Sequence, residues 1–263
     1  MWNPYDALDA NTRRMLGAGA VVVVLGVWCL LSGLDLVSAN KLPAPWEVAE
    51  AFVHLAWNPD KGESPLGAAT AASLSRVAVA ALLLIAVGVP IGILMGASTR
   101  VNAALSPLVD PFRSAPIVAV LPILVMWLGI QESMKITFLF LGAVVYLIPM
   151  VRDAVRAVPP TYYISARDLG ATPWESIRHA VVPMAMPRIA DAVIVAVSIE
   201  WTYITVAEYV NAEVGLGQLM SHARRFSAMD QVFAAIFVII GLALVTHTAM
   251  TAVKKRLYDW ELE

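Results

Sequence analysis

The amino-acid sequence predicts an all-α, polytopic membrane protein with six membrane-spanning helices, and two observations support this fold class. First, 59% of the 263 residues are hydrophobic and only 14% are charged, whereas about a quarter of residues are charged in an ordinary soluble domain. Second, the apolar residues form long uninterrupted blocks, and the mean hydropathy is +0.73. About 20 residues of helix cross a hydrocarbon core about 30 Å thick, and the blocks have roughly that length.

Each predicted span is one of these blocks. Backbone polar groups must be satisfied within the segment in lipid, so we expect helices, and the continuous apolar runs do not alternate as the strands of a membrane barrel do. The fifth span along the chain, Ile189–Ala207, is apolar except for Asp191 and Glu200. The other five carry no charged residue and are Met15–Leu34, Val77–Thr99, Ser114–Gln131, Ile136–Val151 and Val232–Val253.

Prolines and glycines predict local features of two spans. Pro107, Pro111, Pro116 and Pro122 fall in or just before the third span, which we therefore expect to be bent or broken. The second span carries a glycine at every fourth position over residues 88–96, a spacing that favours close helix packing within the chain.

A short helix is also predicted outside the membrane. Pro45-Trp46-Glu47 is a typical helix start. Trp46, Ala49, Phe52 and Val53 would share one apolar face, which suits a helix on the membrane surface, and a packed connector is equally compatible with the pattern.

Charge and cysteine content exclude several function classes. The formal net charge is −2, so there is no basic surplus for a nucleic-acid partner. The single cysteine, Cys29, cannot form an intrachain disulfide and offers no metal-ligand spacing. No Gly-x4-Gly-Lys-Ser/Thr phosphate loop is present, so any work driven by ATP requires another polypeptide.

Lysine and arginine residues predict the orientation in the membrane. With the N-terminus in the cytoplasm, the outer segments carry Lys41, Lys61, Lys135, Arg224 and Arg225, while Arg76 and Arg113 lie at or within span ends. The inner segments then carry Arg13, Arg14, Arg100, Arg152, Arg156, Arg167, Arg178, Arg188, Lys254, Lys255 and Arg256. This bias places both termini in the cytoplasm. We expect a cytoplasmic N-terminus over residues 1–14 and one transmembrane domain over residues 15–263.

The longest predicted cytoplasmic segment, residues 152–188, is highly organised. Thr161–Leu169 forms a predicted helix, and Gly170 stands where the residue after a helix end is usually glycine. Thr172-Pro173-Trp174-Glu175 is a capping box with proline at the first helical position. A second helix is therefore predicted from Pro173 towards Val182.

Two prolines, Pro183 and Pro187, are expected to end that second helix before the next span begins. The loop would then be a rigid projection from the membrane, which is a suitable contact for a soluble partner.

The loop resembles the EAA loop of bacterial ABC importer permeases. That motif reads Glu-Ala-Ala, three residues, Gly, nine residues, Ile, one residue and Leu-Pro. The corresponding residues here are Ile164-Ser165-Ala166, Gly170, Ala180 and Val182-Pro183. The glutamate of the motif is absent, whereas its alanine, glycine and proline are present.

Further segments extend the resemblance over most of the chain, roughly from Leu42 to Trp260. Leu42-Pro43-Ala44-Pro45, Trp127-Leu128-Gly129-Ile130, Val206-Ala207-Glu208 and Gly215-Leu216-Gly217 are similar to family segments in the same order. The subgroup that the sequence resembles most comprises taurine, alkanesulfonate and nitrate permeases.

The resemblance implies a transport mechanism rather than an enzyme. Two copies of the permease would form the pore as a homodimer in a bacterial plasma membrane. Two cytoplasmic ATPase subunits would hold ATP and Mg, with no cofactor in this chain, and an extracytoplasmic binding protein would deliver a small polar solute. The residues implied in ATPase coupling are Ser165, Ala166, Arg167, Asp168, Leu169, Gly170, Ala171, Thr172, Pro173, Trp174, Glu175 and Pro183.

Charged residues within a span are costly and therefore candidates for function. Glu200 lies 11 residues after Ile189, near the membrane midplane, and Ile204 and Glu208 follow at helical spacing on the same face. With Trp201, this face is predicted to line the translocation path.

Structural alternatives remain open for both carboxylates. Glu200 could pair with Arg76 or Arg113, or form a protonated hydrogen bond between helices, and Glu208 could be an ordinary charge at a helix end. An anionic side chain at Glu200 would disfavour an anionic solute unless it is paired or protonated, and would leave room for an amino-bearing or cationic one.

The rival interpretation is an ion-coupled secondary transporter or channel that uses Glu200 and Glu208. An intramembrane enzyme is disfavoured, because no His/Asp/Glu cluster or Ser/His pairing is expected at one depth. Co-purification would distinguish the ABC importer from the ion-coupled carrier. An importer subunit would purify with an ATPase subunit, whereas a carrier would purify alone.

Overall fold

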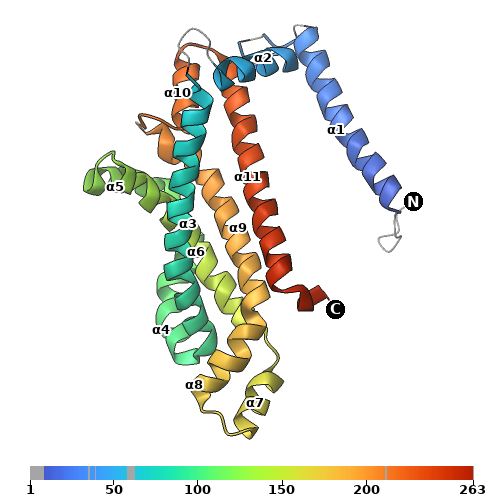
Figure 1. The fold of residues 1–263 in the computed structure, drawn as a ribbon. Coiled ribbons are helices and arrows are strands. Elements are labelled where there is room, and N and C mark those ends of the chain that lie inside the picture. The colour runs from blue at the N-terminus through green and yellow to red at the C-terminus, as the bar shows by residue number, and fades with distance from the viewer. Residues whose placement is uncertain (1–8, 35, 39, 58–62, 211, 263) are drawn as a thin grey trace.

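The computed structural model describes residues 9–34, 36–38, 40–57, 63–210 and 212–262. Residues 1–8 of the predicted cytoplasmic N-terminus lie outside this set. Figure 1 shows a bundle of long helices, from which the N-terminal end of α1 diverges. Five described helices are long and apolar enough to cross a membrane. They are α1 (Ala10–Gly33), α3 (Pro65–Ala97), α6 (Glu132–Arg156), α9 (Val182–Tyr209) and α11 (Met229–Leu257).

One further candidate span, between α3 and α6, is a bent pair of helices. α4 (Thr99–Val109) continues into the 3-10 turn η1 (Asp110–Arg113), and η2 (Ile117–Val120) leads into α5 (Leu121–Leu128). The two halves meet at 95°, and α5 points away from the bundle in Figure 1. The predicted bounds Ser114–Gln131 therefore cover only the second half of this bent pair.

The predicted break is confirmed, and its position explains the difference in bounds. Pro111 and Pro116 lie on either side of it, and each lacks the N–H that would continue a helix. Hydropathy alone treats residues 114–131 as one block, because it contains no term for this backbone defect.

Glycines bring α3 and α6 into close contact. A Cβ on Gly92 would lie 2.6 Å from the Val151 Cβ and 2.8 Å from the Ile148 carbonyl oxygen, and one on Gly96 would lie 2.6 Å from the Val155 Cβ. The predicted role of the glycines in packing within the chain is confirmed.

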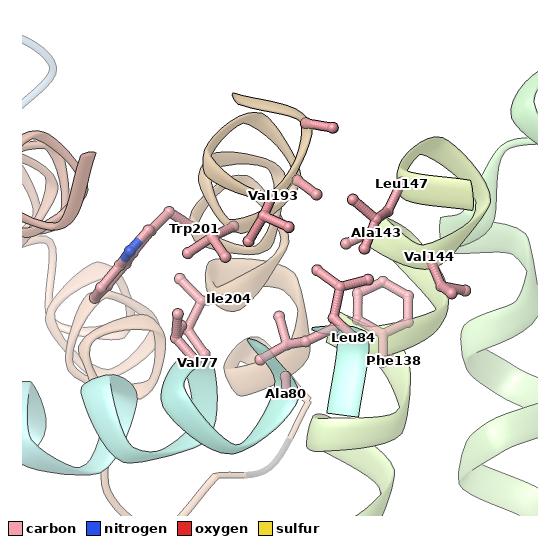
Figure 2. Packing of buried hydrophobic residues seen from close by; sticks show 14 of the residues in the cluster. Val77, Ala80, Leu84, Phe138, Ala143, Val144, Leu147, Val193, Trp201 and Ile204 are labelled. Atoms are coloured by element: carbon pink, nitrogen blue, oxygen red, sulfur yellow. The ribbon is translucent and has the colours of Figure 1, made fainter. Parts of the chain in front are cut away.

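The core lies between α3, α6 and α9. Its fully buried side chains include Leu84 from α3, Phe138 from α6 and Ile204 from α9, and Figure 2 shows these three helices contributing to one apolar cluster. The Phe138 ring also meets Tyr203 edge-on, with the ring centroids 5.8 Å apart. This packing fixes the positions of α3 and α9, which carry the polar groups described below.

The predicted outer helix is α2 (Pro45–Ala56), and one of its faces packs on the bundle. Val48 and Ala51 are buried with Ala234 of α11. The opposite side leaves Trp46 and Val53 exposed. α2 is thus packed on the bundle while its predicted apolar face remains free.

The predicted second loop helix does not end at the prolines. α7 (Pro160–Asp168) is followed by α8 (Pro173–Ser176), and a π-helical turn, η3 (Ile177–Val181), joins α8 to α9 as one helix of 37 residues. The Val182 N–H donates to the Ile177 carbonyl, five residues back.

The π turn explains why the helix continues. A proline ring clashes with the carbonyl four residues earlier in a regular α-helix. The wider turn before Pro183 changes that spacing, so Pro183 lies in the first turn of α9 and Pro187 within it. Helix α10 (Leu216–Arg225) lies at the opposite end of the bundle from α7 and α8 (Figure 1).

Candidate functional site

The first candidate site is the loop formed by α7, Gly170 and α8, residues 160–176, which we call the elbow. Gly170 adopts φ +91°, a left-handed conformation that glycine tolerates without a Cβ clash. Its N–H donates to the Arg167 carbonyl at 3.0 Å, and the Ala171 N–H donates to the Ala166 carbonyl at 3.1 Å. These two bonds form the helix-ending motif predicted from the sequence.

The predicted capping box then starts α8. The Thr172 N–H donates to Glu175 Oε2 at 2.7 Å, and the Glu175 N–H donates to Thr172 Oγ1 at 3.3 Å. The Ser176 hydroxyl also donates to the Thr172 carbonyl at 2.9 Å. Local hydrogen bonds thus determine the turn at Gly170 and the start of α8.

The surface of the elbow is unusually apolar. Leu169 is 90% exposed and Trp174 is 57% exposed, and Ile164 and Tyr162 are exposed beside them. Several large apolar side chains on one rigid projection are typical of a protein-contact surface. The predicted coupling residues Ser165–Glu175 lie together here, whereas Pro183 lies beyond the elbow in the continuous helix.

The second candidate site is a buried polar cluster near the opposite end of the bundle. Arg76 of α3 lies between Glu132 of α6 and Glu208 of α9. Its Nη2 donates to Glu132 Oε1 at 2.8 Å, and its Nη1 donates to Glu208 Oε1 at 2.7 Å. Lys135 also donates to Glu132 at 2.7 Å. Arg76 is 6% exposed and Glu208 is fully buried, so both charges depend on these partners.

The cluster also binds the backbone at the start of α10. Glu208 Oε2 accepts from the Gly217 N–H at 2.8 Å, and the Ser73 hydroxyl accepts from the Leu216 N–H at 3.0 Å. A Cβ on Gly215 would lie 2.5 Å from the Glu208 carboxyl group. A Cβ on Gly217 would likewise lie 2.8 Å from the Glu208 Cβ. Glycine is therefore required at both positions, because the Glu208 side chain lies so close to the backbone. The cluster therefore joins α3, α6, α9 and α10.

The sequence interpretation identified only part of this cluster. Glu208 and Arg76 were recognised as individual charged residues, but Glu132 and Lys135 were missed as members of the site. The available signal was the pair of charges, three residues apart, at the start of an otherwise apolar helix.

Glu200 and Trp201 form a different arrangement in the middle of α9. Glu200 is fully buried and Trp201 is 3% exposed. Among the described residues, neither Glu200 carboxylate oxygen nor the Trp201 Nε1 has a hydrogen-bond partner. The proposed pairing of Glu200 with Arg76 or Arg113 is therefore not present, and neither is the protonated hydrogen bond. Trp201 and Ile204 face the packed interior in Figure 2, and a role of this face in the path stays a prediction.

Known proteins are similar to this chain in both sequence and fold. The family described as binding-protein-dependent transport system inner membrane component matches residues 88–258. The taurine transport system permease protein TauC of Escherichia coli K12 is 31% identical over 94% of this chain and 90% of that protein. The putative aliphatic sulfonates transport permease protein SsuC of Bacillus subtilis 168 is 30% identical over 94% of this chain and 87% of that protein.

A solved structure agrees with the fold. A chain of the MetNI methionine ABC transporter in an inward-facing conformation matches with a TM-score of 0.63 at 22% identity, over 70% of this chain and 92% of that chain. With the sequence relatives, this agreement confirms the all-α permease fold. The chain therefore belongs to the family of binding-protein-dependent transport system inner membrane components and is the membrane-spanning subunit of an ABC importer.

Proposed function

We propose that two copies of this chain form the pore of a plasma-membrane importer, with both termini in the cytoplasm and an ATPase subunit on each elbow. ATP and Mg are held by the ATPase subunits, and an extracytoplasmic binding protein delivers the solute. The solute is a small polar molecule such as taurine, another sulfonate or nitrate. The names of TauC and SsuC support the sulfonates.

The observation that carries this proposal is that the elbow and the bundle share one continuous helix. α8 passes through the π turn into α9, so one helix runs from Pro173 to Tyr209. Near its far end, Glu208 is bonded to α3 and α10. A partner that displaces Trp174 therefore moves a rigid helix whose other end is part of the polar cluster.

The polar cluster also bears on the ion-coupled alternative. Glu208 accepts hydrogen bonds from Ser73, Arg76 and Gly217, so it is held as a structural anion and is unsuited to reversible ion binding. A carrier would have to rely on Glu200 alone. A carrier would also purify without an ATPase subunit, whereas we expect the chain to purify with one.

The test replaces Gly170 with valine. A Cβ at Gly170 would have no atom within 4 Å, so the side chain fits, and the cost comes from the left-handed backbone that a β-branched residue disfavours. We expect ATP-driven taurine uptake into proteoliposomes, with the ATPase and binding protein present, to fall by about tenfold or more, which corresponds to roughly 1.4 kcal/mol.

The matched control is Gly241→Val. Gly241 also has no atom within 4 Å of a Cβ, and its φ is not left-handed, so uptake should be retained. Thermal unfolding in detergent should be similar for both variants. Undiminished uptake by the Gly170→Val variant would reject the coupling role of the elbow.

A further inference from the structure

The break between η1 and η2 lies beside the middle part of α6. The Arg113 carbonyl accepts a hydrogen bond from the Tyr146 hydroxyl at 3.3 Å. Tyr146 follows the start of α6 by 14 residues and precedes its end by 10. At about 1.5 Å per residue, it lies about 21 Å from one end of α6 and about 15 Å from the other. The Arg113 carbonyl therefore lies beside the part of α6 that a hydrocarbon core about 30 Å thick can cover.

The residues of the break are open to their surroundings. Residues 113–116 are all exposed, as is Phe112. Asp110, the acidic residue nearest in sequence, pairs with Arg152 at 3.1 Å. Among the described residues, no carboxylate lies within ion-pair distance of the Arg113 guanidinium. The chain thus presents an uncompensated positive charge at membrane depth.

Lipid is a poor environment for this segment. A charged side chain in the hydrocarbon region is costly, and non-helical backbone at that depth is tolerated only within protein or beside a water-filled cavity. A water-filled path is the environment that satisfies both the charge and the broken backbone.

We propose that Arg113 faces the solute path of the importer and selects solutes that carry an oxyanion group. The guanidinium is planar, always charged and able to bind two oxygens of a sulfonate, nitrate or carboxylate at once. Two contacts hold its backbone: Tyr146 binds the Arg113 carbonyl, and the Arg152–Asp110 ion pair fixes the end of α4 on α6. This assignment rests on the proposed function and adds the residue that favours an anion.

The first test asks whether water reaches position 113. Arg113→Cys is made in a Cys29→Ser background and treated in proteoliposomes containing the ATPase with an anionic, membrane-impermeant methanethiosulfonate and with a lipid-soluble maleimide. We expect the methanethiosulfonate to react, with protection by taurine. Reaction with the maleimide alone would place the residue in lipid, and reaction with neither would place it in a protein interface; either result overturns the proposal.

The second test measures selection. At saturating taurine-loaded binding protein, Arg113→Gln should lower taurine uptake by about tenfold, the factor expected for losing a charge-assisted hydrogen bond, while ATP hydrolysis is retained. Arg113→Lys should restore part of the uptake. Arg100→Gln, an exposed arginine at the start of α4, is the control and should transport normally.

The outcomes separate the two proposals. Normal uptake by Arg113→Gln, or an equal loss in Arg100→Gln, would overturn the role of Arg113. If the unmodified chain shows no ATP-driven uptake of taurine or nitrate, the proposed function fails instead, and the thiol reactions still decide whether Arg113 faces water.

Discussion

At the scale of single residues, the Arg76–Glu208 pair shows how a charge is tolerated deep in this bundle. Each partner removes the cost of burying the other, and the Gly217 and Leu216 N–H groups are satisfied in the same cluster. Such a pair stabilises only while it is complete, because removing one charge leaves the other buried and unpaired. The cluster therefore responds sharply to small chemical changes.

Glu208→Gln tests this dependence. The amide keeps the shape of the side chain but removes the charge that faces Arg76, and its NH2 group cannot accept the bonds that both carboxylate oxygens accept now. We expect the free energy of unfolding to fall by about 3–5 kcal/mol, the usual cost of breaking a buried ion pair, measured as a lower melting temperature in detergent. The control is Glu213→Gln, which changes an exposed acid between α9 and α10. Equal melting temperatures for the two variants would contradict the role of the Arg76–Glu208 pair.

Residue patterns predicted the elbow better than the cluster, for a physical reason. Gly170 and the Thr172–Glu175 box act within a few residues, so their signals are contained in the sequence around them. Arg76 and Glu208 are separated by 132 positions, and which charges meet depends on how α3 packs against α9. Pairing across such a distance cannot be inferred from helix spacing.

At the scale of helices, packing of α3 on α6 depends on the absence of side chains. The glycines of α3 allow Val151 and Val155 of α6 to approach the α3 backbone. The spacing of these glycines predicted the contact, because small residues four positions apart lie on one helix face. The same reasoning gave no warning of the π turn, since a proline in the sequence shows where a regular helix is disfavoured but not how the backbone adjusts.

Gly92→Ala tests the close approach. The added methyl would lie 2.6 Å from the Val151 Cβ and 2.8 Å from a backbone oxygen, so the helices must separate. Overpacking of this kind costs about 1–3 kcal/mol, which should appear as a lower melting temperature in detergent. Gly241→Ala adds the same methyl where no atom lies within 4 Å and should leave the melting temperature equal or slightly higher. A similar effect of the two substitutions would rule out the proposed packing role of Gly92.

At the scale of the whole molecule, the two candidate sites lie near opposite ends of one long helix. The elbow and the polar cluster are connected by the helix from Pro173 to Tyr209. The exposed apolar residues of the elbow lie where a partner can bind the start of that helix. Hydropathy predicted six spans, of which five are single long helices and the sixth is the bent pair, and the prolines predicted the break in that pair. The sideways course of α5 was not predictable, because neither signal contains the 95° angle between the two halves.

The measurement that tests this arrangement most directly is site-specific photo-crosslinking in the assembled transporter. A photoreactive amino acid is placed at Leu169 on the elbow or, as the control, at Trp46 near the opposite end of the bundle; both side chains are exposed. We expect crosslinks to the ATPase subunit from position 169 and none from position 46. An assembled, ATP-hydrolysing transporter that gives no ATPase crosslink from position 169 would contradict the role of the elbow.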